Sequence, residues 1–230
     1  MLEFKYHLID TQGKQKDFIF RIDETELTLI ASLPDNLPEW TKLNFHKCPT
    51  CTLNESEHLY CPVAAHLFPI FEFFRNSVSY ENTTVVLETK DRNYSKHTSL
   101  QQGVSAMSGV VMVTSGCPIL SKLKPMVRFH LPFASPQETL YRAMSMYLME
   151  QYCKYKQGLK PDWELQGLID IYEKVHEVNL VFCQRLTSLQ SKDANVNALI
   201  ILDNFANYIN FSIDHAKLNR IEELFRDNLK

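Results

Sequence analysis

Hydrophobic and polar residues alternate in two stretches near the N-terminus, as they do in strands that bury one face. The apolar positions of these stretches are Phe4, Tyr6 and Leu8, then Phe18, Phe20 and Ile22. Because Gly13 lies between them in a polar segment typical of a turn, the pattern predicts a hairpin over residues 3–23. We expect residues 26–30 to continue the sheet and the β-rich segment 78–88 to join it.

The spacing changes to the three-and-four pattern of helices from residue 98 onward, and Cys61-Pro62 begins an earlier helix. Helix starts are predicted at Ser99 (a capping box with Gln102), at Ser135 (with Pro136 and Glu138), at Pro161-Asp162 and at Asp193. The corresponding ends are predicted at Gly116, at Gly158, near Leu189 and close to Leu229. Segment 89–97 is expected to be a polar, basic loop.

These elements predict an α+β fold in which a small antiparallel N-terminal sheet packs on a mainly helical C-terminal body. The chain has neither an internal repeat nor a clear linker. We therefore expect a single domain over residues 1–230, with a β-rich part over 1–97 and a helical part over 98–230.

The composition is that of a globular protein without a strong charge. Among 230 residues, 45% are hydrophobic and 22% are charged, with a formal net charge of -3, so a nucleic-acid partner is not expected. The N-terminus lacks a basic segment followed by an apolar run, which predicts a cytoplasmic location. The uncharged stretch 98–121 has too many serines, glutamines and glycines for a membrane span and is expected to be a buried helix.

The pattern with the most chemistry is formed by four of the six cysteines. Cys48 and Cys51 are separated by two residues, Cys61 follows after nine more, and Cys117 lies far downstream. Three of the four precede a proline, which stiffens the backbone around a thiolate. In a reducing compartment such clusters are more often metal ligands than disulfides.

The four cysteines predict a tetrahedral site for zinc or a [4Fe–4S] cluster. The pair at 48 and 51 resembles the knuckle of a zinc ribbon, whereas the prolines and the distant fourth ligand favour a cluster, so both metals stay open. His46 or His58 could replace Cys117 as the fourth ligand of a zinc site. The alternative is a set of buried thiols, which is the better interpretation of Cys153 and Cys183.

Two basic segments, 90–97 and 122–130, could border one cleft and bind a phosphate-bearing ligand. The candidate anion-binding residues are Arg92, Lys96, Arg128 and His130, although ordinary solvated loops would have the same composition. An acid–base group of His130 with Glu138 and Arg142 has no supporting motif. Polar residues on the long helices, including Asn179 and Arg185, form either a buried network or a wet face.

Four motifs carry a resemblance to a family of uncharacterised bacterial cytoplasmic proteins, over most of the chain. They are Cys48-Pro49-Thr50-Cys51, Cys61-Pro62-Val63-Ala64, Thr114-Ser115-Gly116-Cys117-Pro118 and Arg128-Phe129-His130-Leu131-Pro132-Phe133. The resemblance implies a bacterial source and a shared cysteine framework, but no activity.

The sequence thus favours a non-enzymatic metal-binding protein with a structural, regulatory or redox-sensing role. Its partner would be another protein or a second copy of this chain, and not a membrane. The alternative is an enzyme or a ligand-binding protein whose anionic ligand lies between the two basic segments. A third hypothesis is an interaction module without a metal.

Overall fold

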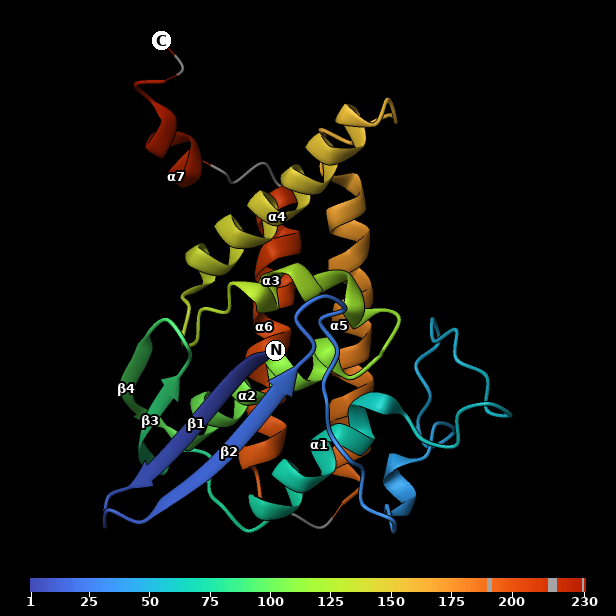
Figure 1. The fold of residues 1–230 in the computed structure, drawn as a ribbon, viewed down its shortest axis with the longest axis vertical. Helices are drawn as coiled ribbons and strands as arrows, with labels where there is room; N and C mark the ends of the chain where they lie inside the picture. The colour runs from blue at the N-terminus through green and yellow to red at the C-terminus, as the bar shows by residue number, and fades with distance from the viewer. Residues whose placement is uncertain (190–191, 215–218, 229) are drawn as a thin grey trace.

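The N-terminal alternation forms a hairpin, as predicted, in the computed structural model of the chain (Figure 1). The structure describes all residues except 190–191, 215–218 and 229. Strand β1 (Leu2–Asp10) pairs antiparallel with β2 (Gln15–Ile22), with Phe4 opposite Phe20. Gly13 has a φ of 80°, the left-handed conformation that the turn requires.

The hairpin is extended into a four-stranded antiparallel sheet of order β2-β1-β3-β4. The predicted strand at 78–88 appears as β3 (Asn82–Glu88), and it pairs with β4 (Asn93–Ser99). The expectation of a loop over 89–97 was therefore wrong, because most of that segment is an edge strand. Residues 26–30 do not form a strand either, since only an isolated bridge between Ile22 and Leu29 is present there.

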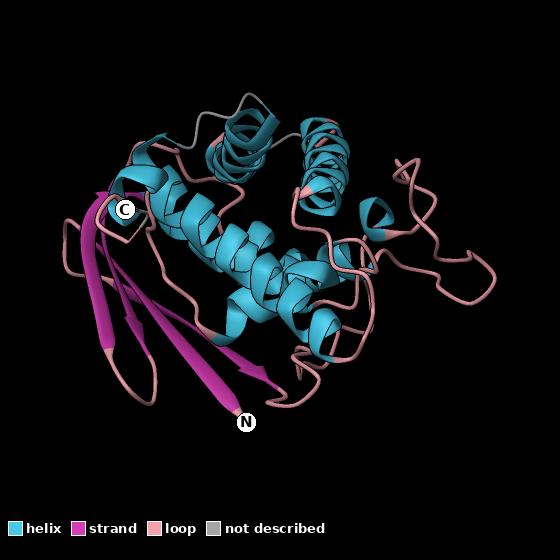
Figure 2. Cartoon of the chain, turned by 90° about the horizontal axis from the view of Figure 1, so that it is seen from above, coloured by secondary structure: helices cyan, strands magenta, loops and turns pink. Residues whose placement is uncertain are grey.

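Helices cover one face of the sheet and leave the other open (Figure 2). The α-helices are α1 (Pro62–Phe73), α2 (Leu100–Thr114), α3 (Lys124–Arg128), α4 (Pro136–Lys156), α5 (Gln166–Thr187), α6 (Ala194–Asp214) and α7 (Asn219–Glu222). Short 3-10 helices are η1 (Glu39–Thr41), η2 (Leu120–Leu123) and η3 (Glu223–Phe225). The α+β class with an N-terminal antiparallel sheet is confirmed.

Helix α2 is the uncharged stretch that was expected to be buried, and it packs against the sheet and against α6. Gly103 allows the close approach to the sheet, because a Cβ atom there would lie 2.8 Å from Cγ2 of Val85. Buried apolar residues of the sheet and of the helices form one cluster around α2. No helix in the described part of the chain has both the length and the apolar character that a membrane crossing requires.

Several predicted helix ends are confirmed. The Ser135 side chain accepts the Glu138 N–H while the Glu138 carboxylate accepts the Ser135 N–H, so the capping box is complete. Gly116 (φ 97°) and Gly158 (φ 75°) follow the ends of α2 and α4. The last predicted helix begins close to Asp193, but α6 ends at Asp214, and part of the predicted continuation to Leu229 lies outside the described residues.

Of the other two predicted helix starts, the one at Ser99 is confirmed but lacks its capping box, and the one at Pro161-Asp162 was wrong. Ser99 precedes α2 without a side-chain capping bond, and Gln102 instead hydrogen-bonds Thr98. Helix α5 begins at Gln166, later than the predicted Pro161-Asp162. The Asp162 carboxylate does act at this helix start, because it accepts the N–H groups of Glu164 and Gly167 at 3.1 and 2.8 Å.

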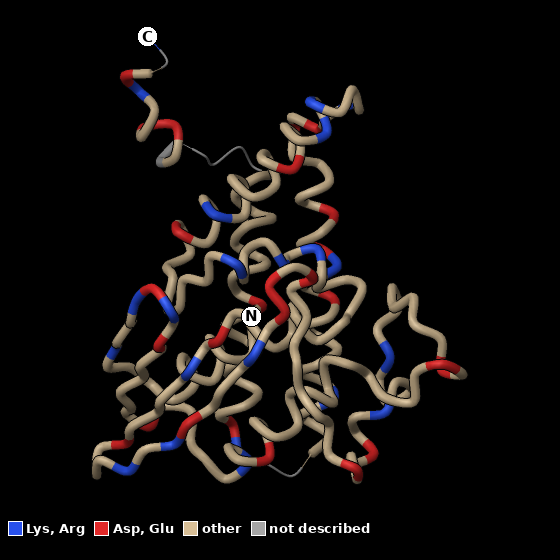
Figure 3. Tube along the Cα trace, viewed as in Figure 1, with Lys and Arg blue, Asp and Glu red and all other residues tan. Residues whose placement is uncertain are grey.

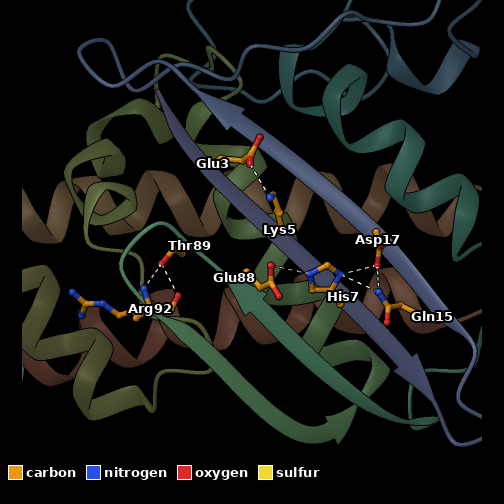
Figure 4. A network of polar contacts seen from close by, with 8 residues as sticks. All are labelled: Glu3, Lys5, His7, Gln15, Asp17, Glu88, Thr89 and Arg92. Carbon is orange, nitrogen blue, oxygen red and sulfur yellow. Dashed lines mark hydrogen bonds and ion pairs between the residues drawn. The ribbon is translucent and has the colours of Figure 1, made fainter.

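The strands carry both Lys or Arg and Asp or Glu positions along their trace (Figure 3). His7 lies 2.8 Å from Asp17 and 3.6 Å from Glu88, and Lys5 lies 3.2 Å from Glu3 (Figure 4). The His7 side chain is 18% exposed, whereas its partners Asp17 and Glu88 are about half exposed to water, where such pairs contribute little to stability. The open face is a solvated surface of the sheet, on the side away from the helical layer.

Candidate metal centre

The four cysteines belong to three segments that meet beside α1, α2 and α5. Cys48 and Cys51 lie in the long loop between η1 and α1, where the Cys51 N–H donates to the Cys48 carbonyl at 3.0 Å. Cys61 is the N-cap of α1, and its N–H donates to the Thr41 carbonyl at 2.8 Å. Cys117 follows the left-handed Gly116 in the turn between α2 and η2.

All four thiol groups lie within electrostatic range of one another. Cys48 interacts with the three other cysteines, Cys117 interacts with Cys61 and Cys51, and Cys61 interacts with Cys51. Cys117 therefore comes back to the other three, although at least 56 positions separate it from them in sequence (117 − 61 = 56). We call these four residues together with Arg185 the cysteine junction.

Backbone N–H groups point at two of the sulfur atoms. The Cys61 side chain accepts hydrogen bonds from the N–H groups of Val63 and Ala64 in the first turn of α1. Cys117 accepts them from Ile119 and Leu120, at the start of η2. Such donors stabilise the thiolate form, which is the form that binds a metal ion. The positions of Cys61 and Cys117 at the starts of two helical segments therefore suit metal ligands.

Arg185 of α5 is the cation of the junction, and it is only 1% exposed. Its guanidinium donates to the carbonyls of Trp40 and Lys42 at 2.5 and 2.8 Å, and to that of His46 at 3.0 Å. It would also attract the thiolate forms of Cys48, Cys51 and Cys61. One buried side chain thus fixes the entry of the cysteine loop and places a positive charge beside three of the four sulfurs.

A second contact holds the knuckle to α5. The Thr50 N–H and hydroxyl both donate to Oε1 of Glu177, at 3.0 and 2.7 Å. The backbone between Cys48 and Cys51 is therefore anchored at its centre. Of the alternatives left open for the polar residues of the long helices, a buried role holds for Arg185 and for Asn179.

In the absence of a metal ion, the surroundings of Cys48, Cys61 and Cys117 raise the pKa values of these thiols. Burial is the largest cause and raises the pKa of Cys48 to about 12, with a further contribution from the neighbouring cysteines, while Arg185 opposes it. The pKa values of Cys61 and Cys117 are raised chiefly by burial too. A divalent cation at the centre would reverse this, since it stabilises the thiolates directly.

Electrostatic range is wider than coordination distance. Zinc–sulfur bonds are about 2.3 Å long, and among the described residues no group of three or more His, Cys, Asp or Glu side chains is arranged so that it could hold an ion. A metal would therefore have to draw the thiols together. His46 and His58, the alternative fourth ligands, are both exposed, and the His46 ring packs edge-on against Phe45.

The two other cysteines differ from each other. Cys183 on α5 is half-buried, and burial raises the pKa of its thiol to about 11, in agreement with the expectation of a packed thiol. Cys153 on α4 is exposed, so the interpretation as a buried thiol was wrong for it. Its apolar neighbour Tyr152 is itself 51% exposed, so an apolar neighbour in sequence did not indicate a buried face of α4.

The candidate anion-binding residues do not gather in one place. Arg92 lies in the turn between β3 and β4, where its backbone bonds Thr89. Arg128 forms an ion pair with Glu24 at 2.8 Å. Lys96 and His130, in contrast, both line one apolar cavity, and His130 lies 2.6 Å from the Tyr6 hydroxyl. Of the four predicted anion-binding residues, the structure therefore brings only Lys96 and His130 to one cavity.

Comparisons with known proteins give a family but no activity. Neither a curated protein nor a solved structure matches the chain. A family model described as a domain of unknown function (DUF6901) matches residues 2–226, nearly the whole chain. The resemblance to a family without an assigned activity is confirmed at this level, and the chain belongs to the DUF6901 family.

Proposed function

We propose that Cys48, Cys51, Cys61 and Cys117 bind zinc or a [4Fe–4S] cluster in a cytoplasmic protein. The observation that carries this proposal is that the four thiols, which come from three separate segments of the chain, all lie within electrostatic range of one another. Cysteines of a packed core need not meet, whereas ligands of one ion must. The backbone donors at Cys61 and Cys117 support the same interpretation.

The bound metal would have a structural or regulatory role. It would connect the loop between η1 and α1 to the start of α1 and to the end of α2. That loop contains little regular structure of its own, so ordering it by hydrophobic burial alone is unfavourable. Because ligand binding to the folded state adds to its stability, the metal would control how well this loop is ordered.

Arg185 supports a site with excess negative charge. Four thiolates outweigh the charge of a zinc ion, and the same holds for a [4Fe–4S] cluster with four cysteine ligands. A buried guanidinium beside three of the ligands compensates part of this excess. The argument applies to both metals, so we keep both.

A redox-sensing role follows from the chemistry of thiolate ligands. A peroxide would oxidise a thiolate ligand by two electrons to a sulfenic acid, with release of hydroxide, and the oxidised sulfur would no longer bind the metal. Loss of one ligand would free the loop from α1 and α2, and the surface around it would change. A protein partner could recognise the changed surface of the loop. The position of the four cysteines at this loop therefore supports a sensing role.

Anaerobic purification followed by metal analysis and an optical spectrum tests the proposal. A brown protein with broad absorbance near about 400 nm would identify a cluster, since thiolate-to-iron charge transfer absorbs there. A colourless protein with stoichiometric zinc would identify the structural site. Protein that binds neither iron nor zinc after anaerobic purification and reconstitution would contradict the proposal.

Serine variants of the four cysteines test the ligands, and Cys153→Ser is the matched control. Cys48→Ser, Cys51→Ser, Cys61→Ser and Cys117→Ser are each expected to lower the metal content, whereas Cys153→Ser should leave it unchanged because Cys153 is exposed on α4. If Cys117→Ser retained the full metal content and spectrum, the fourth ligand would have to be His46, His58 or a residue outside the junction.

A further inference from the structure

A cavity of about 250 Å³ lies between α2, α3, α5, α6 and the segment 129–134. Its walls are mainly apolar, and representative side chains are Val110, Val113, Leu123, Leu202 and Phe205. The cavity is partly open to solvent and shares none of its lining residues with the cysteine junction. Its size is close to the lower end of the range for small-molecule clefts, about 300–1,000 Å³.

One buried polar group of the cavity wall lacks a partner. Asn179 of α5 lines the cavity and is only 2% exposed. Within the part of the chain that the structure describes, its Nδ2 atom has no hydrogen-bond acceptor. An unpaired buried amide costs about 1–3 kcal/mol. The wall of the cavity therefore has one polar donor among its apolar side chains.

The mouth of the cavity carries two cations. Lys96 of β4 is exposed, and its Nζ atom lies 5.8 Å from the centre of the Phe133 ring. Nη2 of Arg142 donates to the carbonyls of Met126 and Phe129, both at 2.9 Å, which fixes its guanidinium beside segment 129–134. Both cations line the cavity, so an anionic group at its mouth would be attracted to them.

Glu138 and His130 lie near these cations, and the phenol of Tyr172 also lines the cavity. Glu138 interacts with Lys96 and Arg142, but its carboxylate is engaged by the Ser135 N–H at 2.7 Å. Burial, with a smaller contribution from Arg142, lowers the pKa of His130 to about 3, so its ring is neutral at pH 7. With two cations, one carboxylate and a neutral histidine, the mouth retains an excess of one positive charge, which suits a monoanion.

We propose that this cavity binds an amphipathic monocarboxylate, with its apolar chain against α2 and α6 and its carboxylate at Lys96 and Arg142. Apolar walls provide affinity for a hydrocarbon chain, and the cations at one end select the head group. The phosphate-bearing ligand expected from the basic segments fits less well, because Arg92 and Arg128 lie outside the cavity lining. The site is independent of the metal.

Titration calorimetry with three ligands of one chain length tests the head group. Decanoate, decanol and decyltrimethylammonium share the same alkyl chain and differ in charge. We expect decanoate to bind about tenfold more tightly than decanol, because a charge-assisted hydrogen bond is lost with the alcohol. The cationic ligand should bind least. Equal affinities for all three, or no binding of decanoate, would overturn the proposal.

Variants locate the site. Lys96→Met should weaken decanoate about tenfold and leave decanol unchanged, whereas Lys122→Met is the control, since Lys122 is exposed and does not line the cavity. Ala106→Leu at the wall should weaken both ligands by filling space. Circular dichroism and thermal melts verify that each variant is folded. If Lys96→Met and Ala106→Leu both bound decanoate like the wild type, the cavity would not be the site.

Discussion

The cysteine junction and the apolar cavity both use α5, but different forces hold them together. The junction consists of loop segments that are fixed by a few directional bonds, of which those of Arg185 reach three carbonyl groups. The cavity is walled by long helices whose packing is spread over many apolar side chains. Single substitutions should therefore disturb the junction much more than the walls of the cavity.

The largest effect is expected for Arg185→Met. The variant leaves the carbonyls of Trp40, Lys42 and His46 without their donor in a buried place, and it should lower the free energy of unfolding by about 3–5 kcal/mol. Urea unfolding followed by circular dichroism measures the change. Lys174→Met on the exposed side of the same helix is the control, with an expected change within about 0.5 kcal/mol. Equal stabilities of the two variants would contradict the role of Arg185.

Metal removal should have the next largest effect. A metal present at a thousandfold excess over its dissociation constant stabilises the folded state by about 4 kcal/mol. Chelated wild-type protein and the untreated Cys48→Ser variant should therefore melt at similar, lowered temperatures, while Cys153→Ser melts like the untreated wild type. A chelated wild type that melts at the unchanged temperature would show that the junction is stable without a metal.

The cavity side should show a pH dependence through His130. Its pKa in the folded protein is about 3, below the ordinary value of about 6.5. As the pH falls, His130 therefore binds a proton in the unfolded chain before it does so in the folded protein. The stability that neutral, buried His130 allows above pH 6.5 is lost progressively between pH 6.5 and pH 3. Two groups face the His130 ring. The Tyr6 hydroxyl of β1 lies 2.6 Å from its Nε2 atom, and the charge of Arg142 on α4 adds to the lowering of the His130 pKa.

His130→Gln isolates this contribution, because glutamine can bond Tyr6 but does not titrate. Between pH 7 and pH 5, the wild type should lose about 2 kcal/mol more stability than the variant. Urea midpoints at the two pH values give the difference. Parallel losses in the two proteins would mean that His130 becomes protonated in the folded state without a penalty.

The smallest effect is expected for Ser135→Ala at the start of α4. Loss of the side chain removes one half of the capping box and should cost about 1 kcal/mol. Metal content should stay unchanged, because α4 does not contribute to the junction. Thermal unfolding and metal analysis of the same sample measure both quantities, and a coupled loss of metal would mean that the two regions are not independent.

The sequence predicted those strands and helices in which apolar residues recur at a clear spacing on one buried face. It missed β4 because Asn93–Ser99 is polar and lies at the edge of the sheet, so that pairing with β3, and not burial, makes it a strand. The start of α5 was misplaced since Pro161-Asp162 has the residues typical of a helix start. In the structure, α5 begins four residues later at Gln166, and the Asp162 carboxylate accepts the N–H group of Gly167 in its first turn.

The cysteine spacing predicted which four thiols the fold brings near one another, because close pairs and Cys-Pro steps restrict where a chain can place its thiols. The role of Arg185 toward the loop at 40–46 depends on contacts between distant segments, which no local pattern contains. One signal was present, since Arg185 follows Val178 and Phe182 at helical spacing on the buried face of α5. The cavity itself is a property of packing and has no signature in the sequence.

X-ray absorption at the metal edge of the anaerobically purified protein tests the account most directly, because it counts the sulfur neighbours of the metal. For a zinc site we predict four sulfur neighbours at about 2.3 Å in the wild type and three in Cys117→Ser. For a cluster, the spectrum of the wild type should contain the sulfide and thiolate sulfurs of iron–sulfur coordination, and the variant should lose cluster. A wild-type shell with only two or three sulfurs, or one unchanged by Cys117→Ser, would contradict the four-cysteine centre.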